Sequence, residues 1–245
     1  MRILMTVRVY KNAEAIGKAA ASLFAATVIR KPDCVLGFAT GSTPVPTYQA
    51  LSELYRDGAV DFSRVTTYNL DEYVGLGHEH EQSYYYFMTD NLFRHINVPK
   101  ENIHVLSGTA KDPAAECAAY DAAIDAAGGI DLQILGIGNN GHIAFNEPAS
   151  TFAPTTHVVN LTESTIQANT RFFNNSDEVP RQALTMGIGS IMKARAIVII
   201  ATGAAKAEAV KAMLTGPVDP TCPASVLQLH PDVTVMLDEA AASLL

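Results

Sequence analysis

The sequence predicts an α/β fold, and three observations support this prediction. Strand-like and helix-like segments alternate along the chain, as in a parallel sheet built from β-α units. The strand-like segments are so apolar, as in Ala196–Ala201, that neither face of the sheet can lie in water. The 245 residues contain no repeat, low-complexity segment or linker. We therefore predict a three-layer, Rossmann-like arrangement, a mostly parallel sheet with helices on both faces, in a single domain of residues 1–245.

The N-terminal part contains two predicted β-α units. Residues 3–9 and 34–38 are the strands, and Asn12 can cap the first helix. The predicted apolar face of that helix consists of Ile16, Ala19, Ala20, Leu23, Phe24 and Thr27. The second helix is expected to begin at Pro44, with Ser42 or Thr43 as its cap. Its predicted buried face consists of Tyr48, Leu51, Leu54 and Tyr55.

The remaining segments continue the alternation of strands and helices. The predicted strands cover residues 65–70, 103–106, 130–135, 158–161, 196–201 and 233–237. The predicted helices run from residue 84 to about 95, from 113 to the glycine pair at 128–129, from 182 to 191, and from 203 to 214.

A glycine-rich loop, residues 136–148, follows the central predicted strand. Its glycines allow a ligand to approach the backbone closely, and open α/β sheets bind ligands at the carboxyl ends of their strands. Asn140, His142 and Glu147 lie in this loop, and a histidine beside a carboxylate suggests acid–base chemistry. On the loop alone, an ordinary strand-to-helix turn with a surface carboxylate explains the pattern equally well.

The other strand ends offer an anion site. Gly41, Ser42 and Thr43 can present backbone N–H groups and hydroxyls to a phosphate, although ordinary helix capping uses the same residues. Lys206 lies in the first turn of a predicted helix, where the dipole disfavours a cation; a bound phosphate would explain it, and a solvated lysine is the alternative. Arg171, among aromatic residues, is either a second phosphate ligand or an exposed charge.

Asp71 ends an apolar strand, so its carboxylate is expected to be desolvated and more basic than usual. Such a group suits removal of a proton from carbon, although an aspartate capping the next segment is a common alternative. The sequence has no Gly-x-Ser-x-Gly elbow and no evident Cys–His pair. We read residues 78–80, His-Glu-His, as a polar loop, and we expect no metal and no cofactor.

Composition restricts the partners and the location. The formal net charge of −8 argues against a nucleic-acid or anionic-membrane surface. No apolar run has the length of a membrane span, and residues 1–7 resemble a strand rather than a signal peptide. The three scattered cysteines form neither a metal motif nor a disulfide framework, which fits a reducing cytoplasm. Together, the composition and the candidate site residues predict a cytoplasmic enzyme that acts on a small phosphorylated metabolite by proton transfer.

Several stretches resemble the glucosamine-6-phosphate deaminase family over nearly the whole chain. They are residues 36–44 (LGFATGSTP), 69–76 (NLDEYVGL), 83–85 (SYY), 136–148 (GIGNNGHIAFNEP), 168–173 (ANTRFF) and 227–231 (LQLHP). The long loop and the Asp-Glu-Tyr stretch are the most specific of these motifs.

This resemblance implies conversion of glucosamine 6-phosphate and water into fructose 6-phosphate and ammonia. By analogy, His142 opens the sugar ring by moving the O1 proton to the ring oxygen, and Asn140 and Glu147 hold its imidazole. Asp71 takes the C2 proton and helps to deliver it to C1, and the resulting enolamine rearranges and loses ammonia. The implied phosphate ligands are Gly41, Ser42, Thr43, Arg171 and Lys206.

The chain departs from parts of the family at three positions. Many relatives have Asp where this chain has Asn140, which can orient a histidine but cannot stabilise imidazolium by charge. Allosterically activated relatives have basic residues at the positions of His157 and Val159, and a longer C-terminus. This chain lacks both basic residues and ends at Leu245. We therefore expect no activation by N-acetylglucosamine 6-phosphate, and we favour a monomer because short, non-allosteric relatives are often monomeric.

Two rival functions share features of this sequence. A 6-phosphogluconolactonase has a similar fold and loop, but usually lacks the Asn146-Glu147-Pro148 ending and the Asp71-Glu72-Tyr73 stretch. A non-catalytic sugar-phosphate sensor that controls transcription would need a DNA-binding module, and this acidic chain is expected to have no room for one.

Overall fold

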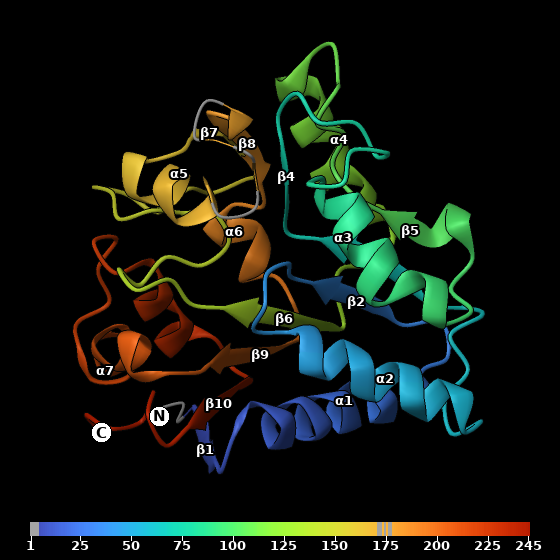
Figure 1. The fold of residues 1–245 in the computed structure, drawn as a ribbon, viewed down its shortest axis with the longest axis horizontal. Helices are drawn as coiled ribbons and strands as arrows, with labels where there is room; N and C mark the ends of the chain where they lie inside the picture. Colours follow the sequence, from blue (N-terminus) through green and yellow to red (C-terminus); the bar gives the residue numbers. More distant parts are fainter. Residues whose placement is uncertain (1–4, 171–172, 174, 176–177) are drawn as a thin grey trace.

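A seven-stranded parallel sheet forms the centre of the protein in a computed structural model, which describes residues 5–170, 173, 175 and 178–245 (Figure 1). Its strand order is β1-β10-β9-β6-β2-β3-β5, and each neighbouring pair is parallel. The strands are β1 (Thr6–Tyr10), β2 (Val35–Phe38), β3 (Thr66–Asn69), β5 (Ile103–His104), β6 (Leu132–Gly136), β9 (Ala196–Ala201) and β10 (Val233–Asp238). The predicted α/β class is confirmed.

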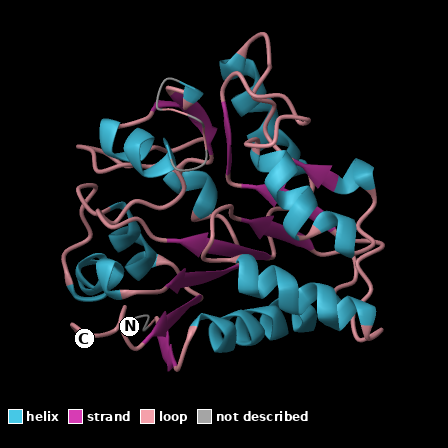
Figure 2. Ribbon diagram, viewed as in Figure 1, coloured by secondary structure: helices cyan, strands magenta, loops and turns pink. Residues whose placement is uncertain are grey.

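Helices cover both faces of this sheet, as Figure 2 shows. On one face, Phe38 of β2 stacks on Phe24 of α1 (Ala13–Arg30) and meets the edge of Tyr48 of α2 (Val45–Arg56). On the other face, Tyr68 of β3 meets the edge of Tyr120 of α4 (Pro113–Ala126). The fully buried β2 and the nearly buried β9 explain why these strands lack polar alternation.

The remaining helical elements are shorter and mostly follow strand ends. They are α3 (Tyr84–Asn91), η1 (Phe93–His95), η2 (Lys100–Asn102), α5 (Glu163–Thr170), α6 (Ile188–Ile191), η4 (Ala204–Lys206), α7 (Ala207–Thr215) and η5 (Pro223–Leu229).

A second, antiparallel sheet of three strands was not expected from the sequence. It has the order β4-β8-β7, with β4 (Asp71–Tyr73), β7 (His157–Asn160) and β8 (Gln182–Thr185). Its own small core contains Tyr73, Phe145, Leu161, Ile166, Val179 and Ala183. The helix predicted over residues 182–191 is therefore wrong, because residues 182–185 pair with strands on both sides and only Ile188–Ile191 is helical.

The structure confirms the predicted N-cap of α1 and corrects its predicted apolar face. The Asn12 side chain accepts the N–H of Ala15, as predicted, and Asp112 accepts two N–H groups of α4. The apolar face predicted for α1 is partly wrong, because Leu23 is 37% exposed while Gly17, Ala21 and Ala25 are buried. The buried stripe is displaced because α1 also packs against α2, where a side chain at Gly17 would collide with Pro46.

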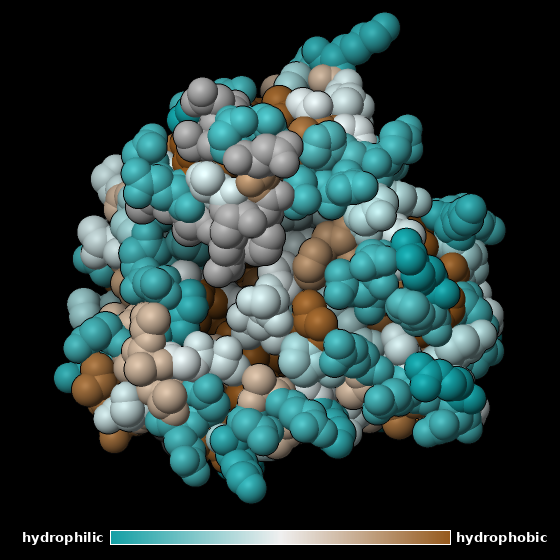
Figure 3. Space-filling view, viewed as in Figure 1, coloured by the Kyte–Doolittle hydropathy of each residue, from teal (hydrophilic) through white to brown (hydrophobic). Residues whose placement is uncertain are grey.

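The face of the molecule seen in Figure 3 is mostly hydrophilic, with brown hydrophobic residues in scattered groups or recessed near its centre. Exposed large apolar side chains such as Val9, Ile29 and Leu229 come from separate elements. Among the described residues, none of the helices has the length and apolar character needed to cross a membrane.

Candidate active site

A cavity of about 900 Å³ opens at the carboxyl ends of β2, β3, β6 and β9. Parallel strands end at one edge of a sheet, which is why residues far apart in the sequence meet there. The predicted site residues that line this cavity are Gly41, Ser42, Thr43, Asp71, Asn140, His142 and Lys206. Glu147 lies behind Asn140, to which it is hydrogen-bonded. Arg171 lies outside the described residues.

The glycines of the loop make room for the His142 imidazole. A Cβ at Gly138 would lie 2.3 Å from Cε1 and Nδ1 of His142, so the ring rests directly on that backbone. Gly141 has a φ of 84°, and a Cβ added at this residue would lie 2.7 Å from Sγ of Cys222. The N–H of Gly138 donates to the carbonyl of His142 at 2.8 Å, which closes the turn.

Glu147, Asn140 and His142 form one polar group. The Asn140 Nδ2 donates to Glu147 Oε2 at 2.6 Å, and the Asn140 Oδ1 accepts the His142 N–H at 3.2 Å. Glu147 Oε2 lies 3.5 Å from His142 Nδ1, an ion-pair distance that is long for a hydrogen bond. Burial alone would raise the pKa of Glu147, but His142, Thr165 and Asn140 together lower that pKa to about 2. The carboxylate therefore stays ionised beside the imidazole.

Thr165 of α5 is a functional candidate that the sequence did not reveal. Its hydroxyl donates to Glu147 Oε1 at 2.6 Å, so the second carboxylate oxygen is also held. The same side chain lines the cavity. No local pattern marks this threonine, because its role depends on where α5 packs relative to the glycine-rich loop.

Asp71 lies at the start of β4, directly after β3 ends. Its side chain lines the cavity although the residue is only 6% exposed. Burial, followed by the neighbouring charge of Glu72, raises the pKa of Asp71 to about 8. This outcome agrees with the expected desolvation and gives a carboxylate that can bind a proton near neutral pH.

The residues between β2 and α2 are arranged as a cradle rather than as a helix cap. The predicted capping by Ser42 or Thr43 is wrong, because Pro44 occupies the N-cap position and no side chain caps the helix. Gly41 adopts a φ of 98°, which turns the chain between strand and helix. Ser42 and Thr43 therefore do not cap α2, and both residues line this wall of the cavity.

Lys206 comes from the opposite wall, after β9. It ends the short turn η4, and its N–H donates to the carbonyl of Gly203 at 3.0 Å. Gly203 has a φ of 87°, and Asp238 of β10 accepts its N–H. This loop therefore places a cation at the cavity that also contains Ser42 and Thr43.

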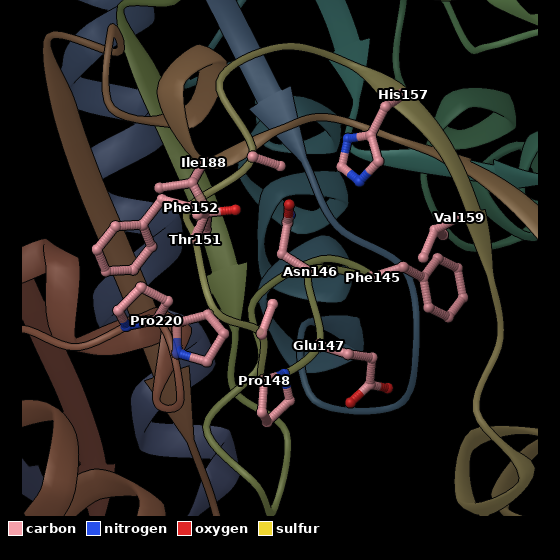
Figure 4. Close-up of a pocket in the computed structure, with 13 residues that line it drawn as sticks. Phe145, Asn146, Glu147, Pro148, Thr151, Phe152, His157, Val159, Ile188 and Pro220 are labelled. Carbon is pink, nitrogen blue, oxygen red and sulfur yellow. The ribbon is translucent and has the colours of Figure 1, made fainter.

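A second, smaller cavity of about 190 Å³ lies on the other side of the loop (Figure 4). His157 and Val159 of β7 line it, together with Asn146 and Glu147. In Figure 4 the side chains of Asn146 and Glu147 extend in opposite directions from the loop. Glu147 therefore lines the smaller cavity and accepts hydrogen bonds from Asn140 and Thr165, which line the larger one.

In the part of the chain that the structure describes, no three His, Cys, Asp or Glu side chains are grouped as metal ligands. The cavity contains a buried carboxylate, a histidine that lies beside a carboxylate, small polar residues and a lysine. This arrangement can move protons on a small anionic substrate.

The family profile described as glucosamine-6-phosphate isomerases/6-phosphogluconolactonase matches residues 10–236. The chain belongs to this family. A family member from Thermoanaerobacter pseudethanolicus, named glucosamine-6-phosphate deaminase, is 54% identical over 245 residues, covering 100% of this chain and 95% of that protein.

Solved structures of both protein types in this family description resemble the chain, but to different degrees. One described as a monomeric glucosamine-6-phosphate deaminase has a TM-score of 0.96 at 45% identity, covering 98% of this chain and 100% of the other. A 6-phosphogluconolactonase from Trypanosoma cruzi has a TM-score of 0.78 at 17% identity, covering 99% and 97%. The second likeness establishes the shared fold alone.

Proposed function

We propose that this protein is a glucosamine-6-phosphate deaminase, which converts glucosamine 6-phosphate and water into fructose 6-phosphate and ammonia. One observation supports this proposal above all: Asp71 and His142 line the same cavity as the cradle at Ser42 and Thr43. An aldose-to-ketose isomerisation needs one group that opens the ring and another that takes a proton from carbon. The close relatives of the same name support the same reading.

His142 is the group proposed to open the ring. It accepts the proton of the O1 hydroxyl and returns a proton to the ring oxygen, so the C1–O5 bond breaks and a C1 aldehyde forms. Glu147 lies 3.5 Å from Nδ1 and stabilises the transient imidazolium by charge. Asn140 accepts the backbone N–H of His142 and supports the loop, while the charge is supplied by Glu147 rather than by residue 140.

Asp71 is proposed as the base for the carbon chemistry. A proton next to the aldehyde is weakly acidic, and a carboxylate with a pKa raised to about 8 is a stronger base than an ordinary aspartate. Removal of the C2 proton by Asp71 and protonation of O1 give an enolamine, and return of a proton from Asp71 to C1, with loss of one proton from the nitrogen, leaves an imine at C2. Water then adds to C2 and ammonia leaves, which balances the reaction.

The phosphate is proposed to lie at the far end of the cavity. The cradle at Gly41, Ser42 and Thr43 and the ammonium of Lys206 supply donors of the type that bind phosphate. Arg171 is proposed as a further ligand from the family motif alone. Fixing the phosphate at one end would place C1 and C2 between His142 and Asp71.

The test is to incubate the purified protein with glucosamine 6-phosphate and to measure ammonia and fructose 6-phosphate together. We expect equal amounts of both products, and almost none from Asp71→Asn or His142→Gln. The control Asp121→Asn, which alters a carboxylate bound to Thr156 and Ser190, should remain active. Hydrolysis of 6-phosphogluconolactone in a parallel assay, without ammonia release, would contradict the proposal. Substrate-induced thermal stabilisation without turnover would favour the sensor instead.

We also propose that residues 1–245 act as a single-domain, cytoplasmic monomer. The description of the similar solved structure as monomeric supports the oligomeric state. The free thiols of Cys34, Cys117 and Cys222 fit a reducing compartment. Light scattering during size-exclusion chromatography should give the mass of one 26.2 kDa chain, and a larger mass would refute the monomer.

A further inference from the structure

Glu72 is a buried carboxylate next to the proposed base, and the mechanism above does not use it. It is the middle residue of β4, between Asp71 and Tyr73, which both line the cavity. Side chains alternate along a strand, so Glu72 points to the opposite face of the small sheet. The residue is completely buried. A charge in such a place is costly unless specific groups stabilise it.

Three backbone N–H groups supply that stabilisation. Glu72 Oε1 accepts the N–H of Tyr73 at 2.8 Å and that of Tyr84 at 2.9 Å, and Oε2 accepts the N–H of Tyr85 at 3.0 Å. Tyr84 and Tyr85 are the first two residues of α3, whose N–H groups have no partner within the helix. The helix dipole also favours an anion at this end.

The helix end that Glu72 holds is part of the cavity wall. Ser83 and Tyr84 line the cavity, and the Tyr84 ring packs against Tyr73, with 4.8 Å between ring centroids. Glu72 therefore connects two pieces of the site, the strand that presents Asp71 and the helical turn that presents Tyr84. Because β4 has only three residues, few other side chains of this strand could connect it to α3.

We propose that Glu72 is a positioning residue for the proposed base: it fastens β4 to the first turn of α3 and places a second negative charge beside Asp71. This inference rests on the proposed function, since it assigns Glu72 a role in the reaction of Asp71. The alternative is that Glu72 only caps α3 and contributes to stability.

The charge of Glu72 acts on Asp71 in a defined direction. Burial raises the pKa of Glu72 to about 7, even though three N–H groups oppose this effect. Burial also raises the pKa of Asp71, and the Glu72 charge raises it further. Removing that charge should lower the pKa of Asp71, so the base stays active to a lower pH.

The other groups around the pair do not replace this charge. Tyrosines on four elements interact with the Asp71 charge, and burial raises the pKa of each, which keeps them neutral; they are Tyr48, Tyr73, Tyr84 and Tyr120. On β8 the partners of Asp71 and Glu72 are Thr185 and Leu184, which are uncharged. Among the described residues, the further ionisable neighbours include His157 beyond Thr185, His78 stacked on Tyr85 and Glu116 near Tyr120, and Glu81, His142 and Lys206 line the cavity.

The test compares pH profiles of kcat/KM for the wild type, Glu72→Gln, Glu72→Asp and the control Asp121→Asn. Glu72→Gln removes the charge and replaces an accepting oxygen with an NH2 donor, so the N–H of Tyr85 loses its acceptor. Its acid limb should therefore move down by about one pH unit and kcat should fall about tenfold. Glu72→Asp keeps the charge but shortens the reach, so its acid limb should stay while kcat falls. Asp121→Asn should keep the wild-type acid limb.

The possible failures can be told apart. A wild-type protein without turnover would refute the proposed function itself. An active wild type together with a Glu72→Gln protein of unchanged acid limb, kcat and KM would overturn the role of Glu72 alone, even if its melting temperature fell. If Glu72→Gln does not fold, Glu72→Asp decides: a lower kcat at an unchanged acid limb supports the inference, and an unchanged kcat overturns it.

Discussion

Single residues in this site are tuned by what surrounds them. Asp71 and Glu147 are both carboxylates near one cavity, yet burial raises the pKa of Asp71 to about 8 while partners lower that of Glu147 to about 2. The first can exchange a proton near neutral pH, and the second remains a fixed negative charge. The opposite pKa shifts of the two carboxyl groups therefore fit different roles, with Asp71 as the proposed base and Glu147 as the proposed stabiliser of the imidazolium charge.

The raised pKa of Asp71 predicts a stability effect as well as loss of activity in Asp71→Asn. A carboxyl whose pKa rises from 3.8 to about 8 on folding stabilises the folded state below pH 4, and this contribution is lost as the pH rises toward 8. The neutral amide avoids that loss. We therefore expect Asp71→Asn to melt at a higher temperature than the wild type at pH 8, with the difference shrinking toward pH 4. An equal or lower melting temperature at pH 8 would refute the burial argument.

Thr165 offers a second test at the residue scale. Thr165→Val removes the hydroxyl that donates to Glu147 at 2.6 Å but keeps the shape of the side chain. A hydrogen bond to a charged group contributes about 1.5–3 kcal/mol, so we expect kcat to fall at least about tenfold with KM nearly unchanged. Thr165→Ser should recover most of the rate. Equal rates for the valine and serine variants would exclude this role.

The sequence predicted which residues gather at the cavity better than it predicted the partners of those residues. Asp71, His142 and the cradle follow predicted strands, and the topology of a parallel sheet brought them to one cavity. Thr165 and Tyr84 escaped prediction because each acts through packing of a helix against the site. The cap expected at Ser42 or Thr43 is wrong because Pro44 takes that position, and both residues instead line the cavity.

At the scale of elements, the glycine-rich loop after β6 depends on backbone that lacks a side chain. Gly138→Ala would place a Cβ 2.3 Å from the His142 ring and force the imidazole to move. A displacement of about 1 Å can cost on the order of a hundredfold in rate, so we expect a kcat loss of that size. Gly136→Ala is the matched control, because nothing lies within 4 Å of its Cβ. Similar rates for the two variants would show that the ring tolerates displacement.

The small antiparallel sheet shows where local prediction failed at this scale. Residues 182–185 carry no marked strand signal, and their conformation is set by pairing with β4 and β7. Long, apolar segments such as β9 were identified because burial on both faces leaves a strong pattern. β4 and β8 have three and four residues and pair only with distant segments, and neither carries such a pattern.

At the scale of the whole molecule, Glu147 lines the smaller cavity together with His157 and Val159, and it is hydrogen-bonded to Asn140 of the larger cavity. A ligand bound in the smaller cavity would lie beside Glu147, the residue that is paired with His142. The resemblance nevertheless predicts no activation, because the basic residues expected in activated relatives are absent at His157 and Val159. We expect a hyperbolic dependence of rate on substrate, unchanged by N-acetylglucosamine 6-phosphate. A sigmoidal curve that this compound makes hyperbolic would contradict the prediction.

Asp71 is the residue proposed to take the proton from C2 of the substrate. Exchange of that hydrogen with water reports on this step. Glucosamine 6-phosphate with tritium at C2 would be incubated with the wild type and with folded Asp71→Asn, and the tritium released to water would be measured. We predict release by the wild type and none above background by Asp71→Asn. Continued release by the variant would show that another residue is the base, and the assignment of this site would be wrong.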